Sequence, residues 1–558
     1  MASIESQPGA DNARIMQVAY VLRQEGKLET AAQYLMHWLQ QNKNDSKAWG
    51  LLAQCMQDSS EYDKAEMAYR RAIVNDPTRT DLAIPLAQTL LAQSKNEAAV
   101  EVLQLARSSD PENQDLGLFL GIQLSALDRQ VESLDCFVSV VELNAANHVA
   151  WAFKSLSHTR LKEYPQALED AEKSIALDGS FAQAWFAKGR VLQKLGQWQD
   201  AAISLRKALE LDPGNDLAQG LLTSIKIVLA EESGNQKEAS QLSQKNLHSL
   251  IRQDAQNLRG GSFPKDISYF KLKHDLEQAQ TMLDMGLGGK SHEQLLEYCG
   301  PLLAGTANGA NQKLQLDARQ ASALADYWLN FPPVMSEPLV AGCLNQGLDW
   351  EAIEQQYLDS TPEIVVIDDF LNPEALHAFQ RFNLLTPAWN REYPENKYLG
   401  AFSSTGYATP LHFQLAGDLR SAMPRIYKDH RLMEFWGFKY DAVIGKGINV
   451  HADHALVNLN FWVTPDEYNL DQRSGGLKLY DVPAPPEWSF GDYNSNAQKI
   501  YEFLQQKNAK THTVTYKCNR AVLFNSALFH ETDTIHFQDT YRGRRVNMTY
   551  LFGEQLGI

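Results

Sequence analysis

The chain has 558 residues, and its 51 Lys and Arg against 68 Asp and Glu give a formal net charge of −17. This length exceeds what one hydrophobic core usually supports, and the acidic balance disfavours binding to a phosphate backbone, so nucleic acid is not an expected partner. No apolar run reaches membrane-spanning length, and Met1 to Ser6 lack the basic and then apolar pattern of a secretory signal.

The five cysteines are scattered and form no Cys-X-X-Cys pair; they are Cys55, Cys136, Cys299, Cys343 and Cys518. Reduced thiols are the simple inference from this spacing. We therefore expect a cytoplasmic protein with no membrane association.

A 34-residue period runs from about residue 11 to residue 215. Its phases are marked by Trp49, Trp151 and Trp185, by Pro77, Pro111 and Pro213, and by Ala31, Ala65, Ala99, Ala167 and Ala201. The fourth unit is the weakest, since Ser133 and Ala145 stand at its alanine and proline phases. An ordinary helical bundle does not easily explain a fixed period of this kind.

This pattern resembles tetratricopeptide repeats, in which two antiparallel helices pack through a small residue and a proline ends the second helix. We predict about six repeats in an all-α solenoid over residues 11–215. Such solenoids present a concave surface that typically binds peptides or extended segments. The expected partner is therefore a protein or peptide.

The segment 216–350 is predicted to be a capping helix followed by a helical connector. The helical pattern continues to Asp254 without the repeat markers, and the stretch from Asn257 to Pro264 then breaks it. Further helices are expected at Tyr269–Met285 and Ala318–Asn330, with a Gly/Ala-rich stretch at Gly305–Ala310 between them.

Three residues in the last quarter of the chain are candidate metal ligands: His451, Asp453 and His530. In extended backbone, His451 and Asp453 leave on the same side and can grip one ion. Two histidines and one carboxylate occupy one face of an octahedral metal and leave the opposite face for substrates. Ligand type alone does not choose between iron, manganese and zinc.

A strand is predicted from Arg545 to Phe552, where polar and apolar residues alternate. Arg545, Asn547 and Thr549 share its polar face. A guanidinium that points into a barrel needs a partner, and its planar fork matches a carboxylate. A dicarboxylate co-substrate would satisfy it.

These motifs, taken in order, resemble the Fe(II)/2-oxoglutarate-dependent oxygenases, in their prolyl-hydroxylase-like branch. The resemblance also covers strands like Glu363–Leu371, Val457–Thr464 and Gly475–Tyr480. It implies that residues 351–558 form a double-stranded β-helix, or jelly roll, with flanking helices.

By position, the resemblance implies iron ligation by His451, Asp453 and His530. It also implies that Arg545 binds the distal carboxylate of 2-oxoglutarate with Thr549 as its hydroxyl partner. Asn547 shares their face, and Asn460 and Trp462 are expected to line the pocket. Trp462 stands where the family commonly has a tyrosine, and an indole cannot accept a hydrogen bond.

Neighbouring residues compete for these roles. His454 follows the ligand pair directly but should face away from Asp453, and His536 is expected in a surface loop. Glu531 is expected to orient or solvate His530. Arg542 and Arg544 compete with Arg545 for the carboxylate, and strand parity favours Arg545.

The resemblance implies a hydroxylase that uses Fe(II), 2-oxoglutarate and O2, with ascorbate as a candidate reductant. It would couple decarboxylation of 2-oxoglutarate to succinate and CO2 with hydroxylation of a C–H bond. The repeats favour a protein or peptide substrate, with proline as the leading choice over asparagine, aspartate, arginine, lysine or a small molecule. The rival hypothesis is a repeat scaffold with a catalytically silent metal-binding domain. Halogenation is disfavoured because those relatives replace the carboxylate ligand, here Asp453, by a small residue.

Overall fold

The computed structural model describes residues 8–304, 313–331, 338–339, 341–393, 397–441, 443–444 and 447–554, so the stretch 305–310 lies outside the described residues. The chain divides into two compact units, Met1–Asn215 and Asp216–Ile558. Within the described ranges, none of the helices is both long and apolar enough to cross a bilayer.

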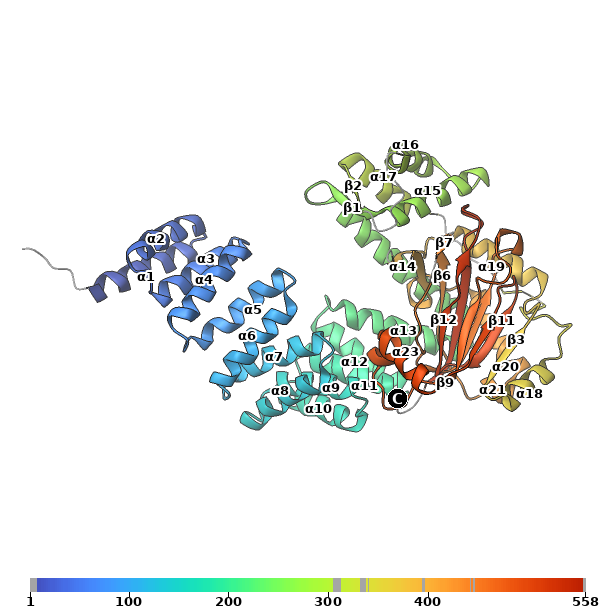
Figure 1. Cartoon of the computed structure of the whole chain (residues 1–558), viewed down its shortest axis with the longest axis horizontal. Helices are drawn as coiled ribbons and strands as arrows, with labels where there is room; N and C mark the ends of the chain where they lie inside the picture. The colour runs from blue at the N-terminus through green and yellow to red at the C-terminus, as the bar shows by residue number, and fades with distance from the viewer. Residues whose placement is uncertain are drawn as a thin grey trace, which may run out of the picture. The chain divides into compact units, whose positions relative to one another are not determined.

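The first unit is a succession of helices, drawn in blue to cyan in Figure 1. They are α1 (Pro8–Gln24), α2 (Leu28–Gln41), α3 (Ser46–Asp58), α4 (Tyr62–Asn75), α5 (Ala83–Ala92), α6 (Asn96–Ser109), α7 (Gln114–Ala126), α8 (Gln130–Leu143), α9 (His148–Arg160), α10 (Tyr164–Leu177), α11 (Ala182–Lys194) and α12 (Trp198–Leu211), with a short 3-10 helix, η1 (Thr80–Leu82), before α5. From α4 to α12, the even-numbered helices begin 34 residues apart.

Small residues let these helices approach closely, as the period predicts. Ala31, Ala65, Ala99, Ala167 and Ala201 are all fully buried, and so is Ser133, which replaces alanine in the fourth unit. A Cβ on Gly189 of α11 would lie 2.6 Å from the Leu205 side chain of α12, so the close contact there requires glycine.

The tryptophans of the period hold the turns that precede their helices. The indole Nε1 of Trp49 donates to the carbonyl of Lys43 at 2.8 Å, and that of Trp185 donates to Gly179 at 2.9 Å. The helices before two of the marked prolines end at Asn75 and Leu211, just ahead of Pro77 and Pro213, since proline cannot continue a helix.

The second unit begins with helices and continues into sheets. Its helices are α13 (Asp216–Glu232), α14 (Gln236–Arg259), α15 (Tyr269–Asp284), α16 (Lys290–Ala304), α17 (Ala318–Leu329), α18 (Trp350–Asp359), α19 (Pro373–Leu385), α20 (Pro410–Ala422), α21 (Pro424–Tyr427), α22 (Phe490–Asn494) and α23 (Ala497–Gln506), with 3-10 helices at Ser403–Thr405 and Asp466–Tyr468. The helices expected at 269–285 and 318–330 are α15 and α17.

Helix α14 packs on the loop that follows β5 (Tyr398–Phe402), more than 150 residues away in the chain. Ser243 donates to the carbonyl of Ser403 at 2.5 Å, and Gln244 donates to that of Gly406 at 2.7 Å. The segment expected to be a capping helix and connector is therefore joined to the sheet region by buried polar contacts.

The strands of the second unit pair antiparallel throughout the described residues. They are β1 (Lys265–Ser268), β2 (Lys313–Leu316), β3 (Ile364–Ile367), β4 (Arg391–Tyr393), β5, β6 (Leu432–Tyr440), β7 (Val443–Ile444), β8 (Ala455–Trp462), β9 (Leu477–Pro483), β10 (Thr511–Val514), β11 (Ala521–Asn525), β12 (Leu528–Thr532), β13 (Ile535–His536) and β14 (Val546–Glu554). The larger sheet has the order β3-β11-β8-β14-β6-β5-β4, and a smaller one has the order β10-β9-β12.

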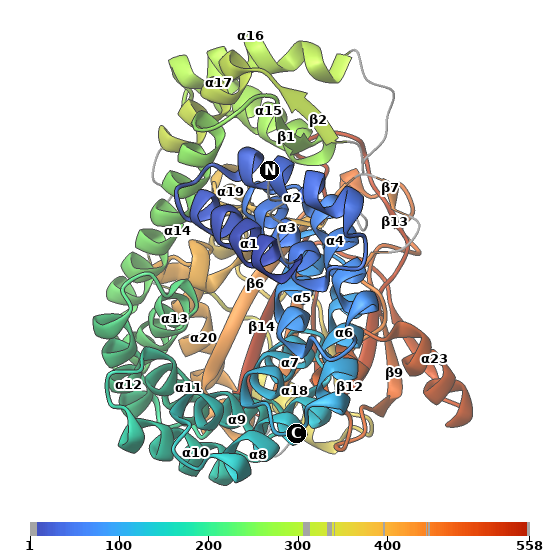
Figure 2. The same cartoon turned by 90° about the vertical axis from the view of Figure 1, so that its left-hand side faces the viewer.

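Alternation along the strands separates two buried layers. On one face of the larger sheet, Phe461 of β8 and Tyr550 of β14 belong to a core that includes Phe379 and Phe382 of α19. On the other face, Trp462 packs in a cluster with residues of the smaller sheet. Figure 2 shows β6 and β14 side by side, in agreement with their pairing. The structure thus has a multi-strand antiparallel sheet with flanking helices, while the jelly-roll winding stays a prediction.

Candidate metal and co-substrate site

A backbone bridge brings together residues that lie 79 positions apart in the numbering. The N–H of His451 donates to the carbonyl of His530 at 3.0 Å, and the N–H of His530 donates back to His451 at 2.8 Å. His530 lies in the middle of β12, and His451 comes just before β8. The two imidazoles therefore leave the backbone as neighbours, with ring centroids 4.3 Å apart.

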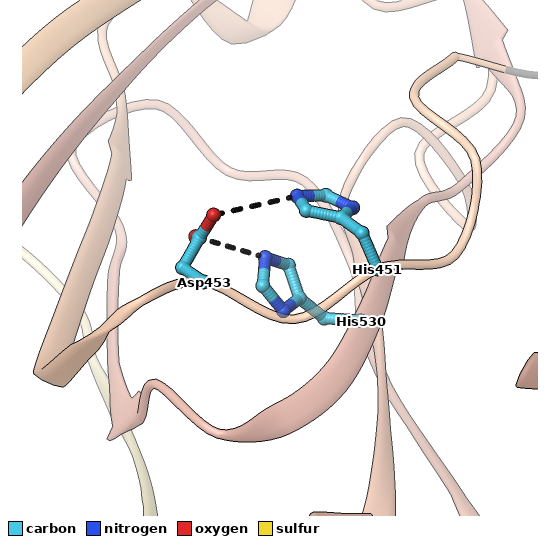
Figure 3. A group of neighbouring side chains, drawn as sticks. All are labelled: His451, Asp453 and His530. Atoms are coloured by element: carbon cyan, nitrogen blue, oxygen red, sulfur yellow. Dashed lines mark ion pairs between the residues drawn. The ribbon is translucent and has the colours of Figure 1, made fainter. Parts of the chain in front are cut away.

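The side chains of His451, Asp453 and His530 point toward one another (Figure 3). One carboxylate oxygen of Asp453 lies 3.8 Å from Nε2 of His451, and the other lies 3.5 Å from Nε2 of His530. One ligand atom from each residue can be chosen so that all three lie within 4.8 Å of one another. Ligands about 2.1 Å from a metal lie about 3 Å apart when adjacent and about 4.2 Å when opposite. The ligand atoms of the cluster are therefore slightly farther apart than adjacent ligands around a bound metal, and a small inward movement of the side chains would bring them around one ion.

Both imidazoles are held with Nε2 toward the cluster. Nδ1 of His451 lies 2.8 Å from the carbonyl of Asn449, and Nδ1 of His530 lies 3.0 Å from that of Leu528. A carbonyl can only accept, so each Nδ1 carries a proton, and each Nε2 faces the Asp453 carboxylate. Metal-ligating histidines are commonly oriented in this way.

The protonation states also suit cation binding. Burial, together with the neighbouring His530, lowers the pKa of His451 to about 4. Burial alone would raise the pKa of Asp453, but its hydrogen bond with His530 and the charges of both histidines lower it to about 2. At neutral pH the cluster therefore offers a neutral His451 imidazole and an ionised Asp453 carboxylate, which are the forms that bind a metal.

A buried chain of hydrogen bonds leads away from Asp453. The amide of Asn458 donates to Asp453 at 2.7 Å, and the amide of Asn460 donates to Asn458 at 2.7 Å. The Oδ1 of Asn460 then accepts from the Thr549 hydroxyl at 2.7 Å and from the Asn547 amide at 2.8 Å. Three of the residues expected at the co-substrate pocket are thus connected to the metal cluster through Asn458.

Arg545 lies immediately before β14 and is almost completely buried. Its Nε donates to the carbonyl of Gly475 at 2.5 Å and its Nη2 to that of Gly476 at 3.3 Å. The carbon Cζ lies 4.9 Å from the ring centroid of Tyr440 and 5.5 Å from that of Trp462. Among the described residues, no carboxylate forms an ion pair with Arg545, and its Nη1 has no hydrogen-bond partner.

Burial lowers the pKa of Arg545, because the charged form is desolvated, and the nearby Tyr440, Tyr516 and Asp533 offset only part of this effect. Two further unpartnered polar atoms belong to the same expected set: Nε1 of Trp462 and Oδ1 of Asn547. These two residues are directly opposite each other on β8 and β14. Trp462 cannot accept a hydrogen bond, but its free N–H can donate one.

The resemblance predicts a strand that begins at Gly475. In the structure, Gly475 and Gly476 come before β9, which begins at Leu477. Gly475 has a positive φ of 83°, and a Cβ on Gly476 would lie 1.8 Å from the carbonyl oxygen of Val514. Glycine is required at both positions, and the turn aims their carbonyls at the guanidinium of Arg545.

The competing residues have other surroundings. His454 and His536 are outside the cluster of possible ligands, and His536 is exposed. The carboxylate of Glu531 accepts from the hydroxyls of Tyr480 at 2.7 Å and Tyr501 at 2.5 Å. Glu531 is therefore held by tyrosines beside His530.

The other two arginines lie elsewhere. Arg542 is exposed, and Arg544 is buried with Nη2 2.6 Å from Glu277 of α15. The contact of Asn458 with Asp453 was not predicted from the sequence, although Asn458 shares its strand parity with Asn460 and Trp462. That shared parity was the available signal for its contact with Asp453.

Comparisons with known proteins concern the repeats. A sequence model described as Tetratricopeptide repeat matches residues 182–215. Hsp70-Hsp90 organizing protein 2 of Arabidopsis thaliana is 33% identical over 168 residues, which are 30% of this chain and 28% of that protein. Protein STIP1 homolog of Dictyostelium discoideum is 30% identical over 90 residues, 16% of each chain. A solved structure titled YrrB, a TPR protein with an unusual peptide-binding site, is 21% identical with a TM-score of 0.30, covering 34% of this chain and 97% of that one.

The chain spans about a third or less of the length of these curated relatives. Together with the 34-residue spacing of the helices, the matched model and the relatives establish that the first unit contains tetratricopeptide repeats.

Proposed function

We propose that the second unit is an Fe(II)- and 2-oxoglutarate-dependent oxygenase that hydroxylates a C–H bond, and that the repeats recruit its protein or peptide substrate. The observation that carries this proposal is the joint geometry of two features. His451, Asp453 and His530 form a cluster that can hold one metal, and Arg545 is a buried cation without a carboxylate partner in the described residues. The jelly-roll assignment belongs to the same proposal.

In this proposal His451, Asp453 and His530 hold the iron, and Arg545 binds the far carboxylate of 2-oxoglutarate through its free Nη1. Thr549 and Asn547 border that carboxylate, and the Trp462 N–H can donate to it. With O2, the bound metal and co-substrate supply an oxidation that yields succinate, CO2 and a hydroxylated substrate carbon. The protein contributes position and the exclusion of water.

The hydrogen-bond chain from Asp453 to Thr549 supports a shared site. Since Asn458 donates to Asp453, it fixes the carboxylate plane and strengthens its ionised form. The same chain reaches Asn460, which accepts from both Asn547 and Thr549. One polar network can therefore keep the metal and the co-substrate in a fixed relation.

The proposed substrate is a protein or peptide side chain, with proline as the first candidate. Support comes from the first unit, because repeats of this class commonly bind peptides. The experiment measures succinate formed from 2-oxoglutarate by the full chain with Fe(II), O2 and ascorbate. Wild type should form succinate, and His451→Ala with Asp453→Ala should abolish it.

His536→Ala is the matched control, because this exposed histidine lies outside the cluster. It should leave the rate unchanged. If the double variant forms succinate as fast as wild type, the proposed site is wrong. If the double variant is inactive, it is used to trap the substrate, and mass spectrometry then tests whether wild type adds one oxygen to the trapped protein or peptide.

The second candidate function is an adaptor that binds partners through its repeats and carries a catalytically silent C-terminal unit. The similarity to Hsp70-Hsp90 organizing proteins favours this candidate. The same variants separate the two functions. An adaptor would retain its partners in wild type and in the double variant alike, and neither protein would form succinate.

A further inference from the structure

A cavity in the C-terminal unit lies on the helix-covered face of the larger sheet. Its volume is about 210 Å³, and it is bordered by α19, by the end of β6, and by the segments around residues 463–468 and 541–546. Strand parity separates it from the co-substrate pocket. Arg544 lines this cavity, whereas the next residue, Arg545, reaches the carbonyls of Gly475 and Gly476.

The charged groups that line this cavity are basic. Arg381, Lys439, Arg542 and Arg544 contribute to its wall, and no Asp or Glu does so among the described lining residues. The chain as a whole has a net charge of −17, so such a concentration is not expected by composition. Arg381 and Arg542 are exposed and form no ion pair within the described part of the chain.

Arg544 is 2% exposed, and only part of its hydrogen-bonding capacity is used. Its Nη2 donates to Glu277 at 2.6 Å. Its Nε and Nη1 are buried and have no hydrogen-bond partner. A buried N–H without a partner costs free energy, and for a charged group the cost is larger. An acceptor is therefore expected beside this guanidinium.

Lys439 is a second buried basic residue that lines the cavity. Its Nζ donates to the carbonyl of Asn383 at 2.9 Å and to the hydroxyl of Tyr541 at 3.1 Å, and it lies 4.6 Å from the ring centroid of Trp389. No carboxylate pairs with it among the described residues. Burial lowers the pKa of Lys439 well below its usual value, and an anion in the cavity would restore its charged form.

We propose that this cavity binds a small tetrahedral oxyanion of the phosphate class. The volume is below the roughly 300–1,000 Å³ typical of sites for larger organic ligands, so the occupant is small. Basic groups reach the cavity from α19, β6 and the segment before β14. Several oxygens on one dianion can accept from such separate donors, whereas a single carboxylate is matched by one guanidinium fork.

The test is calorimetric titration of the full chain with inorganic phosphate and, separately, with O-phospho-L-serine, against sodium chloride at matched ionic strength. The exposed residues Arg381 and Arg542 are changed to glutamine, singly and together. Arg473→Gln is the matched control, because its side chain is 93% exposed and does not line the cavity. Arg545→Lys reports on the co-substrate pocket.

Wild type and Arg473→Gln should bind phosphate equally. Each single change should weaken binding about threefold and the double change about tenfold, because each removes one largely solvated charge contact. Tighter binding of phosphoserine would identify a phosphorylated side chain as the occupant, and tighter binding of phosphate would identify the free ion. The proposal is overturned if neither compound binds, if the double variant binds as wild type does, or if only Arg545→Lys weakens binding. None of these results depends on succinate formation.

Discussion

Replacing Arg545 by lysine is expected to weaken 2-oxoglutarate binding about 10- to 150-fold. Arg545 uses Nε and Nη2 on the carbonyls of Gly475 and Gly476, which leaves Nη1 for the co-substrate. A lysine keeps the charge but has one nitrogen to divide between the carbonyls and the carboxylate. Loss of one charge-assisted hydrogen bond costs about 1.5–3 kcal/mol, which is this range of dissociation constants.

The assay is anaerobic calorimetric titration of the Fe(II)-loaded full chain with 2-oxoglutarate, accompanied by the melting temperature of each variant. Arg544→Lys is the matched control, because Arg544 is equally buried and adjacent but contacts Glu277. It should change the 2-oxoglutarate dissociation constant by less than about threefold. Equal affinities of wild type and Arg545→Lys would refute the assignment of Arg545 to the co-substrate.

Three further predictions concern stability and metal affinity. The pKa of His412 is lowered to about 3 by burial, from a usual value of 6.5, so the unfolded chain binds more protons between these values and stability falls as pH decreases. The contribution of His412 should make the free energy of unfolding in urea about 2 kcal/mol lower at about pH 5 than at about pH 7.5. In His412→Gln, the free energy of unfolding should fall by about 2 kcal/mol less over the same pH range. Asn458→Leu should lower metal affinity about 10- to 100-fold by freeing Asp453, measured by competition with a chelator; unchanged affinity would contradict the role of Asn458. Ala201→Leu should destabilise the first unit by about 1–3 kcal/mol through overpacking, while Ile203→Leu on the same helix, 55% exposed in wild type, should change its unfolding midpoint little.

The first unit could be predicted well from the sequence because its contacts are local and periodic. Ala65 and Ala201 differ by a multiple of the repeat length, and both are fully buried for the same packing reason. Each tryptophan bonds a carbonyl six residues earlier, so the turn geometry repeats with the sequence. Local signals of this kind need no knowledge of distant segments.

The candidate cluster was predicted by residue type and order, and the structure places His451, Asp453 and His530 together. Their supporting contacts were harder to foresee. The bond from Asn458 to Asp453 depends on how the chain turns between the ligand pair and β8, and the bonds from Arg545 to Gly475 and Gly476 join segments 70 residues apart. Strand parity gives the face of a side chain but not its partner.

The attachment of α14 was also invisible to periodicity. Its residues continue a helical pattern, and nothing in that pattern shows that Ser243 and Gln244 bond a loop about 160 positions later. The sequence therefore predicted a connector, whereas the contacts join this helix to the sheet-containing unit.

That attachment decides where the two halves of the protein can be separated for biochemical work. A fragment starting at residue 351 would strip α14 from Gly406, whose backbone lies so close to Leu247 that an added Cβ would sit 2.4 Å from that side chain. Water would then reach the carbonyls of Ser403 and Gly406 and the apolar surface beside them. A fragment that begins near residue 216 keeps the contacts between α14 and this loop. The smallest fragment to test for the proposed activity therefore includes both α13 and α14.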